Sequence, residues 1–538
     1  MRKRMLSLFV ALLFLFGTVV LRVLYLSQGT LAQASEQQAS MTLTIGESRG
    51  TIYDTNLRPL VNTGTAYRAS VAPYPETLLV LSENLSGEEL ATLLDRLQDG
   101  KPVVTALDRL LPIVDGLQQV QVPVRYSGRL LAPHVIGYVD STGREGVTGI
   151  EYAYDELLQS FAGEATITYG VDAMGLPMQG IAAETSNTLG RAQGGVVLTI
   201  DSEIQRIAED AAREGMTRGA VVVMEPDTGR ILAMVSLPDY QPDTVADSLD
   251  DPGAPLLNRA ITNYNCGSVF KLVTTAAALE QGIPLDTTFY CDGQVTIGDM
   301  SFHCYNLWGH GTLNLPQALA KSCNPYFMQL AQLVGGDAIY DMAVELGFNR
   351  PLVLAENYQT ARALLPDREE IRTAGSLANL SIGQGGLMAT PVHIAQLVAT
   401  IVNGGEVIAP TLIKGTVDEN GEFTEATVSL PQRVFSEQTA NTIREMMLGV
   451  VTDEGTSPDA QPFPEGAGGK SGTAETGWIE DGIEVVQSWF AGYYPADDPK
   501  YVVTVLVENR DARGETSAPI FRSICEELYL LDMTDTAG

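Results

Sequence analysis

The chain has 538 residues, a formal net charge of −33 and an apolar fraction of 45%, which is sufficient for two or three domains with their own cores. The acidic charge leaves no basic stripe to meet phosphates, so it argues against nucleic acid as a partner. Seven lysines and four histidines leave little material for a Ser-His-Asp triad or a zinc site, and neither HExxH nor CxxC occurs, so the sequence predicts no metal and no cofactor.

The N-terminus carries a basic cluster followed by an apolar run. The run extends to residue 26 and is long enough to cross a bilayer if Arg22 snorkels to the far interface. The cluster predicts a cytoplasmic tip at 1–4, a single transmembrane anchor at 5–26 and an extracytoplasmic remainder, which places the protein in the cell membrane. A cleaved signal peptide is the alternative, because Ala32-Gln-Ala34 resembles a processing site. The length of the apolar run favours the uncleaved anchor.

Residues 27–195 show short strand-like runs and no catalytic constellation. Residues 41–45 alternate in polarity, as in a strand, and residues 86–98 have the pattern of an amphipathic helix that begins at a capping serine, Ser86. Residues 152–158 are also expected to be helical. A composition shift near Gly195 marks the end of this stretch, which is predicted to be a spacer or docking module.

Residues 196–531 predict one antiparallel sheet with helices packed on it, and residues 532–538 are predicted to be a tail. Turn residues at 226–229 separate two apolar runs and indicate a hairpin. The other predicted strands lie at 196–200, from 468 onward, at 488–494 and at 501–507. The predicted helices begin at Asp201, near Ser268, near Leu315, at Pro325, at Thr390 and near residue 517.

Ser268 and Lys271 stand three residues apart at the start of an Ala-rich apolar segment. That spacing places both on one face of a helix's first turn, near free backbone N–H groups. The lysine amine there could take the serine's proton, which gives an activated nucleophile without histidine. Alone, the pair is also compatible with an ordinary helix that has a polar N-terminus.

Two further signals follow in order. They are Ser322-x-Asn324 and Lys470-Ser471-Gly472, the second followed by Thr473. Together with the first pair, they form the motif set of penicillin-binding proteins and serine β-lactamases. The chain resembles the class B high-molecular-weight penicillin-binding proteins, the monofunctional peptidoglycan D,D-transpeptidases.

The resemblance covers nearly everything after residue 40. Further matching segments are Arg49 to Asp54, Gly149 to Glu151 with Tyr154-Asp155, and Gly383 to Gly386 with Thr390-Pro391. The segment at 383–386 lacks the Gly-Lys-Ser/Thr ending of a phosphate loop and is predicted to be a backbone turn. The chain departs from the family at Cys266, where many members have proline, and at Ser471, where threonine is common.

The resemblance implies an α+β fold with a serine β-lactamase/transpeptidase-like domain, which follows a transmembrane helix and an elongated, mainly β pedestal of the dimerisation type. It implies that Ser268 is the nucleophile, Lys271 the base and Ser322 the proton donor to the leaving D-alanine. It implies that Lys470 and Thr473 bind the substrate carboxylate. The remaining substrate-binding positions are Asn324, Ser471 and Gly472.

By the same resemblance, the partners are peptidoglycan stem peptides ending in D-alanyl-D-alanine, β-lactams and a SEDS-type membrane glycosyltransferase. Two alternatives stay open: a D,D-carboxypeptidase or β-lactamase of the same fold, and a membrane sensor or divisome scaffold without turnover. The sequence does not separate roles in division, elongation and sporulation. It also leaves open whether Cys291 and Cys304 form a disulfide, whereas Cys266 and Cys323 are predicted to be packing residues.

Overall fold

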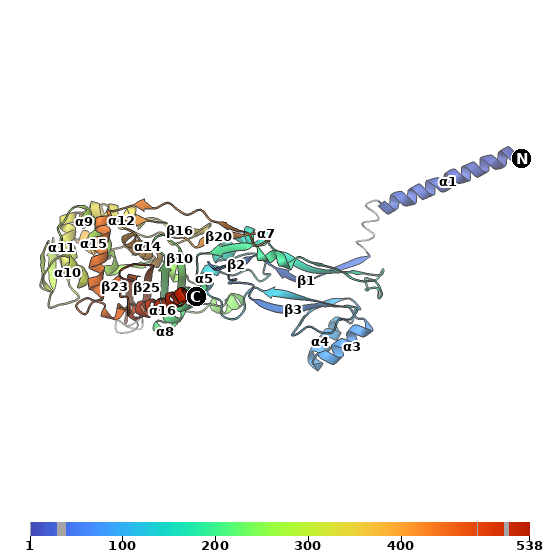
Figure 1. Cartoon of the computed structure of the whole chain (residues 1–538), viewed down its shortest axis with the longest axis horizontal. Helices are drawn as coiled ribbons and strands as arrows, with labels where there is room; N and C mark the ends of the chain where they lie inside the picture. Colours follow the sequence, from blue (N-terminus) through green and yellow to red (C-terminus); the bar gives the residue numbers. More distant parts are fainter. Residues whose placement is uncertain (1, 29–38, 481–482, 510–515, 538) are drawn as a thin grey trace. The chain divides into compact units, whose positions relative to one another are not determined.

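The structure is a computed structural model that describes residues 2–28, 39–480, 483–509 and 516–537 (Figure 1). The chain divides into two compact units. The first contains residues 1–50, 62–125 and 160–193, and the second contains residues 51–61, 126–159 and 194–538. The possible processing site at Ala32-Gln-Ala34 lies outside the described residues.

Helix α1 (Arg2–Gln28) is apolar enough to cross a membrane over residues 2–25, where the mean hydropathy is 2.4 and no residue is buried. At 1.5 Å per residue it exceeds the roughly 30 Å of a bilayer's hydrocarbon core. A single-pass membrane anchor fits this helix, as the sequence predicts.

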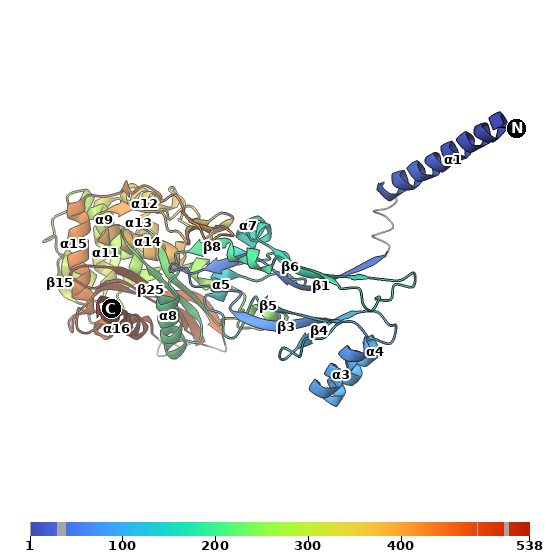
Figure 2. The ribbon, with the colours of Figure 1, turned by 45° about the vertical axis from the view of Figure 1, so that its right-hand side comes forward.

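The rest of the first unit contains two three-stranded antiparallel sheets and two α-helices (Figure 2). One sheet has the order β1 (Ser40–Ser48), β6 (Gly163–Gly170), β7 (Glu184–Asn187), and the other β4 (Val103–Leu107), β3 (Gly64–Val71), β5 (Leu117–Val124). Helices α3 (Pro75–Asn84) and α4 (Gly87–Arg96) share a core with the second sheet. Ser86 caps α4 in a capping box with Glu89, which confirms the predicted helix start.

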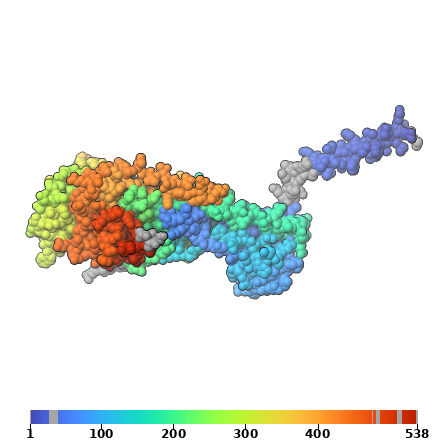
Figure 3. All heavy atoms as spheres, in the orientation of Figure 1, coloured from blue at the N-terminus to red at the C-terminus, as the bar shows by residue number. Residues whose placement is uncertain are grey.

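The second unit is built on a five-stranded antiparallel sheet. Its order is β10 (Ile231–Leu237), β9 (Gly219–Met224), β25 (Tyr501–Asn509), β24 (Ile483–Tyr494), β23 (Gly468–Glu480). Helices α8 (Ser202–Gly215) and α16 (Ser517–Ala537) pack on one face, and α14 (Pro391–Val402) packs on the other. Along β9, Val221 and Val223 belong to the core beneath α8 and α16, whereas Val222 belongs to the opposite core. This alternation is the period of two that a sheet covered on both faces requires. Figure 3 shows the packed surface of this unit.

The predicted strand at 196–200 does not join that sheet. It forms β8 (Gly195–Leu198) in a four-stranded sheet of order β2 (Thr51–Tyr53), β8, β20 (Ile413–Val417), β21 (Phe423–Glu425). β8 pairs with β2 in parallel, and a Cβ atom on Gly195 would lie 1.8 Å from the Thr51 carbonyl oxygen. The stretch predicted as a pedestal therefore contributes residues 51–61 and 126–159 to the second unit.

A largely helical part covers the α14 face of the five-stranded sheet. Its helices are η4 (Gly267–Phe270), α9 (Lys271–Glu280), α10 (Leu315–Ala320), α11 (Asn324–Val334), α12 (Gly336–Glu345), α13 (Ala374–Ser381) and α15 (Glu437–Leu448). Two-stranded antiparallel pairs join β11 (Tyr264–Asn265) with β18 (Met388–Ala389), β12 (Phe289–Cys291) with β15 (Gly311–Leu313), β13 (Gln294–Ile297) with β14 (Met300–His303), β16 (Val353–Ala355) with β17 (Tyr358–Gln359) and β19 (Glu406–Val407) with β22 (Gln432–Arg433). The remaining short helices of the unit are α5 (Pro133–Ile136), α6 (Gly149–Ala153), α7 (Asp155–Ser160), η2 (Pro242–Ser248), η3 (Arg259–Ile261), η5 (Glu370–Arg372), η6 (Gly449–Val451) and η7 (Pro458–Ala460), and η1 (Leu189–Gln193) belongs to the first unit.

Candidate active site

Ser268 lies in the short 3-10 turn η4, and Lys271 is the first residue of α9. The sequence predicts both in the first turn of one helix. In the structure, Ser268 lies instead in a tighter 3-10 turn that directly precedes α9. Gly267 opens the turn with φ +54°, a backbone conformation that favours glycine, and a Cβ atom there would lie 2.8 Å from the carbonyl oxygen of Thr473. Ser268 is half-buried, and its hydroxyl makes no hydrogen bond to any residue that the structure describes. The nucleophile candidate is therefore accessible and not engaged elsewhere.

Strand β23 places the third motif beside this turn. Lys470 pairs in register with Ala491 and Gly472 with Trp489, and both of these partners belong to the core on the helical face of the sheet. Because residues two apart on a strand share a face, the Lys470 side chain points into the helical part, where it is fully buried. Gly472 lies against η4, since a Cβ atom there would be 3.2 Å from the Cys266 carbonyl oxygen.

The second motif supplies the group that joins the two lysines. Lys271 Nζ donates hydrogen bonds to Ser322 O at 2.7 Å, to Ser322 Oγ at 3.2 Å and to Asn324 Oδ1 at 2.6 Å. Lys470 Nζ donates to Ser322 Oγ at 2.9 Å and to Ser471 O at 2.9 Å. The Ser322 hydroxyl thus bridges the amino groups of both lysines. Ser322 is held at φ +48°, an uncommon conformation for a residue with a side chain.

Burial sets the electrostatics of this cluster. Desolvation lowers the pKa of Lys271 to about 7. Desolvation, and then the charge of Lys271, hold the pKa of Lys470 well below its usual value. Among the described residues, none of the hydrogen bonds of these two amines goes to a carboxylate that would stabilise both charges. Near neutral pH, Lys271 can therefore be an unprotonated amine that accepts a proton.

The glycine-rich segment predicted as a backbone turn has that conformation, with φ +79° at Gly383 and +88° at Gly386. The Gly267 N–H donates to the Gly383 carbonyl at 3.1 Å, and a Cβ atom on Gly383 would lie only 2.0 Å from Gly267 O. This turn therefore supports the backbone of the Ser268 turn directly. The sequence pattern indicated a turn but gave no signal of that contact.

The structure brings the predicted site residues together to different extents. Lys271, Ser322, Asn324 and Lys470 form one hydrogen-bonded cluster. Ser268, Gly472 and Thr473 lie along the contact between η4 and β23, where Thr473 is exposed and available to a ligand.

The hydroxyl of Ser471 has a different partner, Thr456 Oγ1, at 2.9 Å. Thr456 and the ring of Phe327, whose centroid lies 5.4 Å from Lys271 Nζ, are neighbours of the site that no motif marks. Only their position in the fold reveals them.

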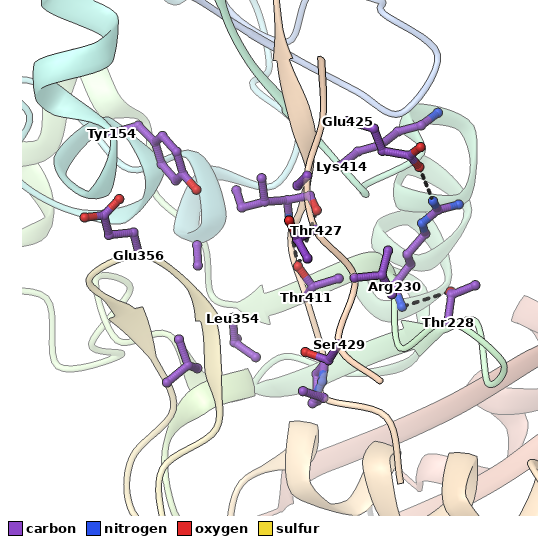
Figure 4. A pocket seen from close by; sticks show the side chains of 17 residues that line it. Tyr154, Thr228, Arg230, Leu354, Glu356, Thr411, Lys414, Glu425, Thr427 and Ser429 are labelled. Carbon is purple, nitrogen blue, oxygen red and sulfur yellow. Dashed lines mark hydrogen bonds and ion pairs between the residues drawn. The ribbon is translucent and has the colours of Figure 1, made fainter. Parts of the chain in front are cut away.

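A cavity of about 270 Å³ lies elsewhere in the second unit (Figure 4). Its lining includes residues of the β16 hairpin, β20 and β21, and also Arg230, which forms an ion pair with Glu425 at 3.2 Å. Lys414, another lining residue, donates to Thr55 O at 2.7 Å. None of the predicted site residues lines this cavity, so it is not the place of the chemistry.

Comparison with known proteins agrees with this geometry. Residues 219–526, more than half of the chain, match the penicillin-binding protein transpeptidase domain. The peptidoglycan D,D-transpeptidase PbpA of Mycolicibacterium smegmatis is 34% identical over 360 residues, which are 61% of this chain and 71% of that protein. Penicillin-binding protein 3 of Mycobacterium tuberculosis, complexed with aztreonam, is similar with a TM-score of 0.67 at 25% identity, over 92% of this chain and 97% of that one. The penicillin G acyl-enzyme complex of penicillin-binding protein A from the same organism gives a TM-score of 0.65 at 27% identity, over 90% and 99% of the two chains. The chain therefore belongs to the penicillin-binding protein transpeptidase family, in its class B branch.

Proposed function

We propose that this protein is a peptidoglycan D,D-transpeptidase that cross-links stem peptides through a serine acyl-enzyme and is acylated by β-lactams. One observation carries the proposal: the Ser322 hydroxyl bridges two buried amines, Lys271 and Lys470, one turn from the unengaged hydroxyl of Ser268. The names of its relatives support the same reaction class.

Ser268 Oγ attacks the carbonyl carbon between the two terminal D-alanines, and the neutral amine of Lys271 takes the hydroxyl proton. Lys470 and the Thr473 hydroxyl bind the terminal carboxylate, and Asn324 orients the peptide amide. The backbone N–H groups of Ser268 and Thr473 stabilise the oxyanion, each worth about 3 kcal/mol. Ser322 then relays a proton to the nitrogen of the departing D-alanine, and the C–N bond breaks. An amine of a second stem peptide attacks the ester, forms the cross-link and releases Ser268.

The same proposal covers location and partners. Helix α1 anchors the protein with its basic end, which includes Arg2, Lys3 and Arg4, in the cytoplasm. The catalytic unit lies outside the cytoplasm, where the cell wall is built. The part of residues 27–195 that belongs to the first unit acts as a pedestal. A SEDS-type glycosyltransferase is the membrane partner that the family resemblance implies.

Labelling of the full-length protein with a fluorescent penicillin tests the nucleophile. Ser268→Ala should abolish the label. Ser376→Ala is the matched control, because Ser376 is a half-buried serine of α13 outside the site, and it should label like wild type. Equal labelling of Ser268→Ala and wild type would remove Ser268 from its role.

The stability of the label and the product separate the alternatives. A transpeptidase keeps the penicillin ester far longer than one catalytic cycle and forms a cross-linked dimer from a stem pentapeptide and an acceptor amine. Rapid release of hydrolysed penicillin would instead favour a β-lactamase. Labelling without formation of the cross-linked dimer and without release of hydrolysed penicillin would favour a sensor or scaffold.

A further inference from the structure

Four potential metal ligands meet beside the second motif, and the proposed chemistry uses none of them. Cys291, Cys304, His310 and Cys323 offer donor atoms that all lie within 4.8 Å of one another. His310 Nδ1 lies 3.8 Å from Cys291 Sγ and 3.6 Å from Cys304 Sγ. The three thiols are free and buried, and His310 is half-buried.

The backbone holds these ligands in place. Cys291 ends β12, and His310 immediately precedes β15, the partner strand of β12. The His310 N–H donates to Cys291 O at 3.1 Å, and the Cys304 N–H donates to Gly293 O at 2.9 Å. Cys323 is the N-cap residue of α11. Three ligands therefore come from one hairpin region and the fourth from the start of a neighbouring helix.

The distances fit a tetrahedral zinc ion. With Zn–S near 2.3 Å and Zn–N near 2.05 Å, the sulfur-to-nitrogen edges of the tetrahedron are about 3.6 Å and the sulfur-to-sulfur edges about 3.8 Å. The two measured sulfur-to-nitrogen separations agree with the first value. Thiolate and imidazole donors select zinc over magnesium or calcium. Four protein ligands leave no open position, which is the arrangement of a structural site.

We propose that this cluster binds one Zn²⁺ ion, with Cys291, Cys304, His310 and Cys323 as ligands. The sequence predicted no metal and treated Cys323 as a packing residue. The sequence pattern does not indicate this site, because twelve, five and twelve residues separate the successive ligands and no CxxC pair occurs. Only the fold brings them together.

The site has a consequence for the proposed chemistry, and this second part rests on the proposed function. Cys323 stands between Ser322 and Asn324, and Lys271 hydrogen-bonds to both of these neighbours. A zinc–sulfur bond to Cys323 fixes the middle of this tripeptide against the hairpin region, which keeps Ser322 in its uncommon backbone conformation. The zinc ligands are thus positioning residues for the Ser322 hydroxyl and the Asn324 amide.

Metal content tests the site itself. Full-length protein is purified in detergent under reducing conditions from zinc-supplemented cells, and its zinc and free thiols are counted. One zinc per chain is expected in wild type, with loss in Cys304→Ser and His310→Ala. Retention is expected in Cys525→Ser, which removes a buried thiol of α16 outside the cluster. His310→Cys keeps four ligands and should restore zinc, which guards against a ligand variant that merely misfolds.

Three results would overturn the site. The first is fully reduced wild type that carries no zinc and takes up none from a zinc buffer. The second is an unchanged zinc content in Cys304→Ser and His310→Ala. The third is an intact mass showing a disulfide within the cluster of protein taken directly from cells, because a bridged pair cannot supply its two thiolates.

Acylation by fluorescent penicillin tests the positioning part. Removal of zinc by a chelator should slow acylation by at least tenfold, and Zn²⁺ but not Mg²⁺ should restore it. Equal rates with and without zinc would overturn the positioning role and leave both the metal site and the proposed function standing. A zinc-loaded protein that is never acylated would overturn the proposed function and leave the metal site standing.

Discussion

At the scale of single residues, the site places two amines in the interior with a shared hydroxyl, and none of their hydrogen bonds to described residues goes to a carboxylate. Such an arrangement disfavours charge on at least one of them, because a buried ammonium group without a counterion is expensive. A fold selected only for stability would pair these charges or replace them. Lys271 is therefore suited to accept a proton, and Lys470 is suited to bind an anion.

The pH dependence of acylation follows from the pKa of Lys271. This pKa is lowered to about 7 by burial, so the fraction of neutral base rises as the pH increases through 7. The acylation rate constant should fall about tenfold per pH unit well below this value and level off about one unit above it. Stopped-flow measurement with a fluorescent penicillin from acid to mildly alkaline pH checks the profile.

Two variants complete that measurement. Lys271→Met should lose acylation at every pH because the proton acceptor is gone. Lys414→Met, which removes a lysine of the same unit that contacts Thr55, should reproduce the wild-type profile. A wild-type rate that does not change with pH would contradict the assignment of Lys271 as the titrating base.

Ser322 should matter more for acylation than for stability. Ser322→Ala removes the oxygen that accepts from both amines and relays the proton, so acylation should fall by about 10²–10³-fold, within the range typical of a lost acid–base group. Ser381→Ala is the control, since Ser381 is a buried serine of α13 whose hydroxyl, among the described residues, bonds only to Ala378 O. A rate for Ser322→Ala within twofold of wild type would exclude the relay.

At the scale of elements, the nucleophile's position depends on a backbone contact between η4 and the 383–386 turn. Gly383→Ala and Gly386→Ala both force a side chain into a positive-φ conformation, at a cost of about 1–2 kcal/mol each. Only the first places its Cβ atom against the Gly267 carbonyl, whereas the second finds open space. Acylation should fall more than tenfold in Gly383→Ala and stay within a few-fold of wild type in Gly386→Ala. The two variants are compared by penicillin acylation and thermal melting, and equal acylation rates would show that the contact does not position Ser268.

Local signals allowed most of these elements to be predicted. The turn at 226–229 predicts the β9–β10 hairpin, and Asp201 caps α8 through hydrogen bonds from the N–H groups of Glu203 and Ile204. The motif residues could be named because the chemistry restricts their types. Pairings between distant segments could not be predicted, since nothing near β8 indicates that its partner is β2, over 140 residues earlier. The proposed zinc site could not be predicted for the same reason, because its ligands come from segments that only the fold brings together.

At the scale of the whole molecule, the second unit needs residues that precede the boundary predicted at 195. Ile52, Val135, Ile136 and Ile150 are fully buried and belong to its main core. Each such side chain contributes about 1.5–3 kcal/mol when buried. Together they approach the whole stability of a typical domain, about 5–15 kcal/mol.

Two truncated proteins test this dependence. A fragment of residues 196–538 loses those four side chains and exposes the edge of β8 that β2 covers, so it should aggregate or melt at a much lower temperature than the full chain. A fragment of residues 39–538 lacks only α1 and the segment after it, and no residue of the apolar span of α1 is buried, so it should melt and bind penicillin like the full chain. Circular dichroism melts and penicillin labelling compare the two fragments. Equal melting temperatures of the 196–538 fragment and the full chain would mean that residues 196–538 fold on their own. Residues 51–61 and 126–159 would then add nothing to the stability of the core on which they pack.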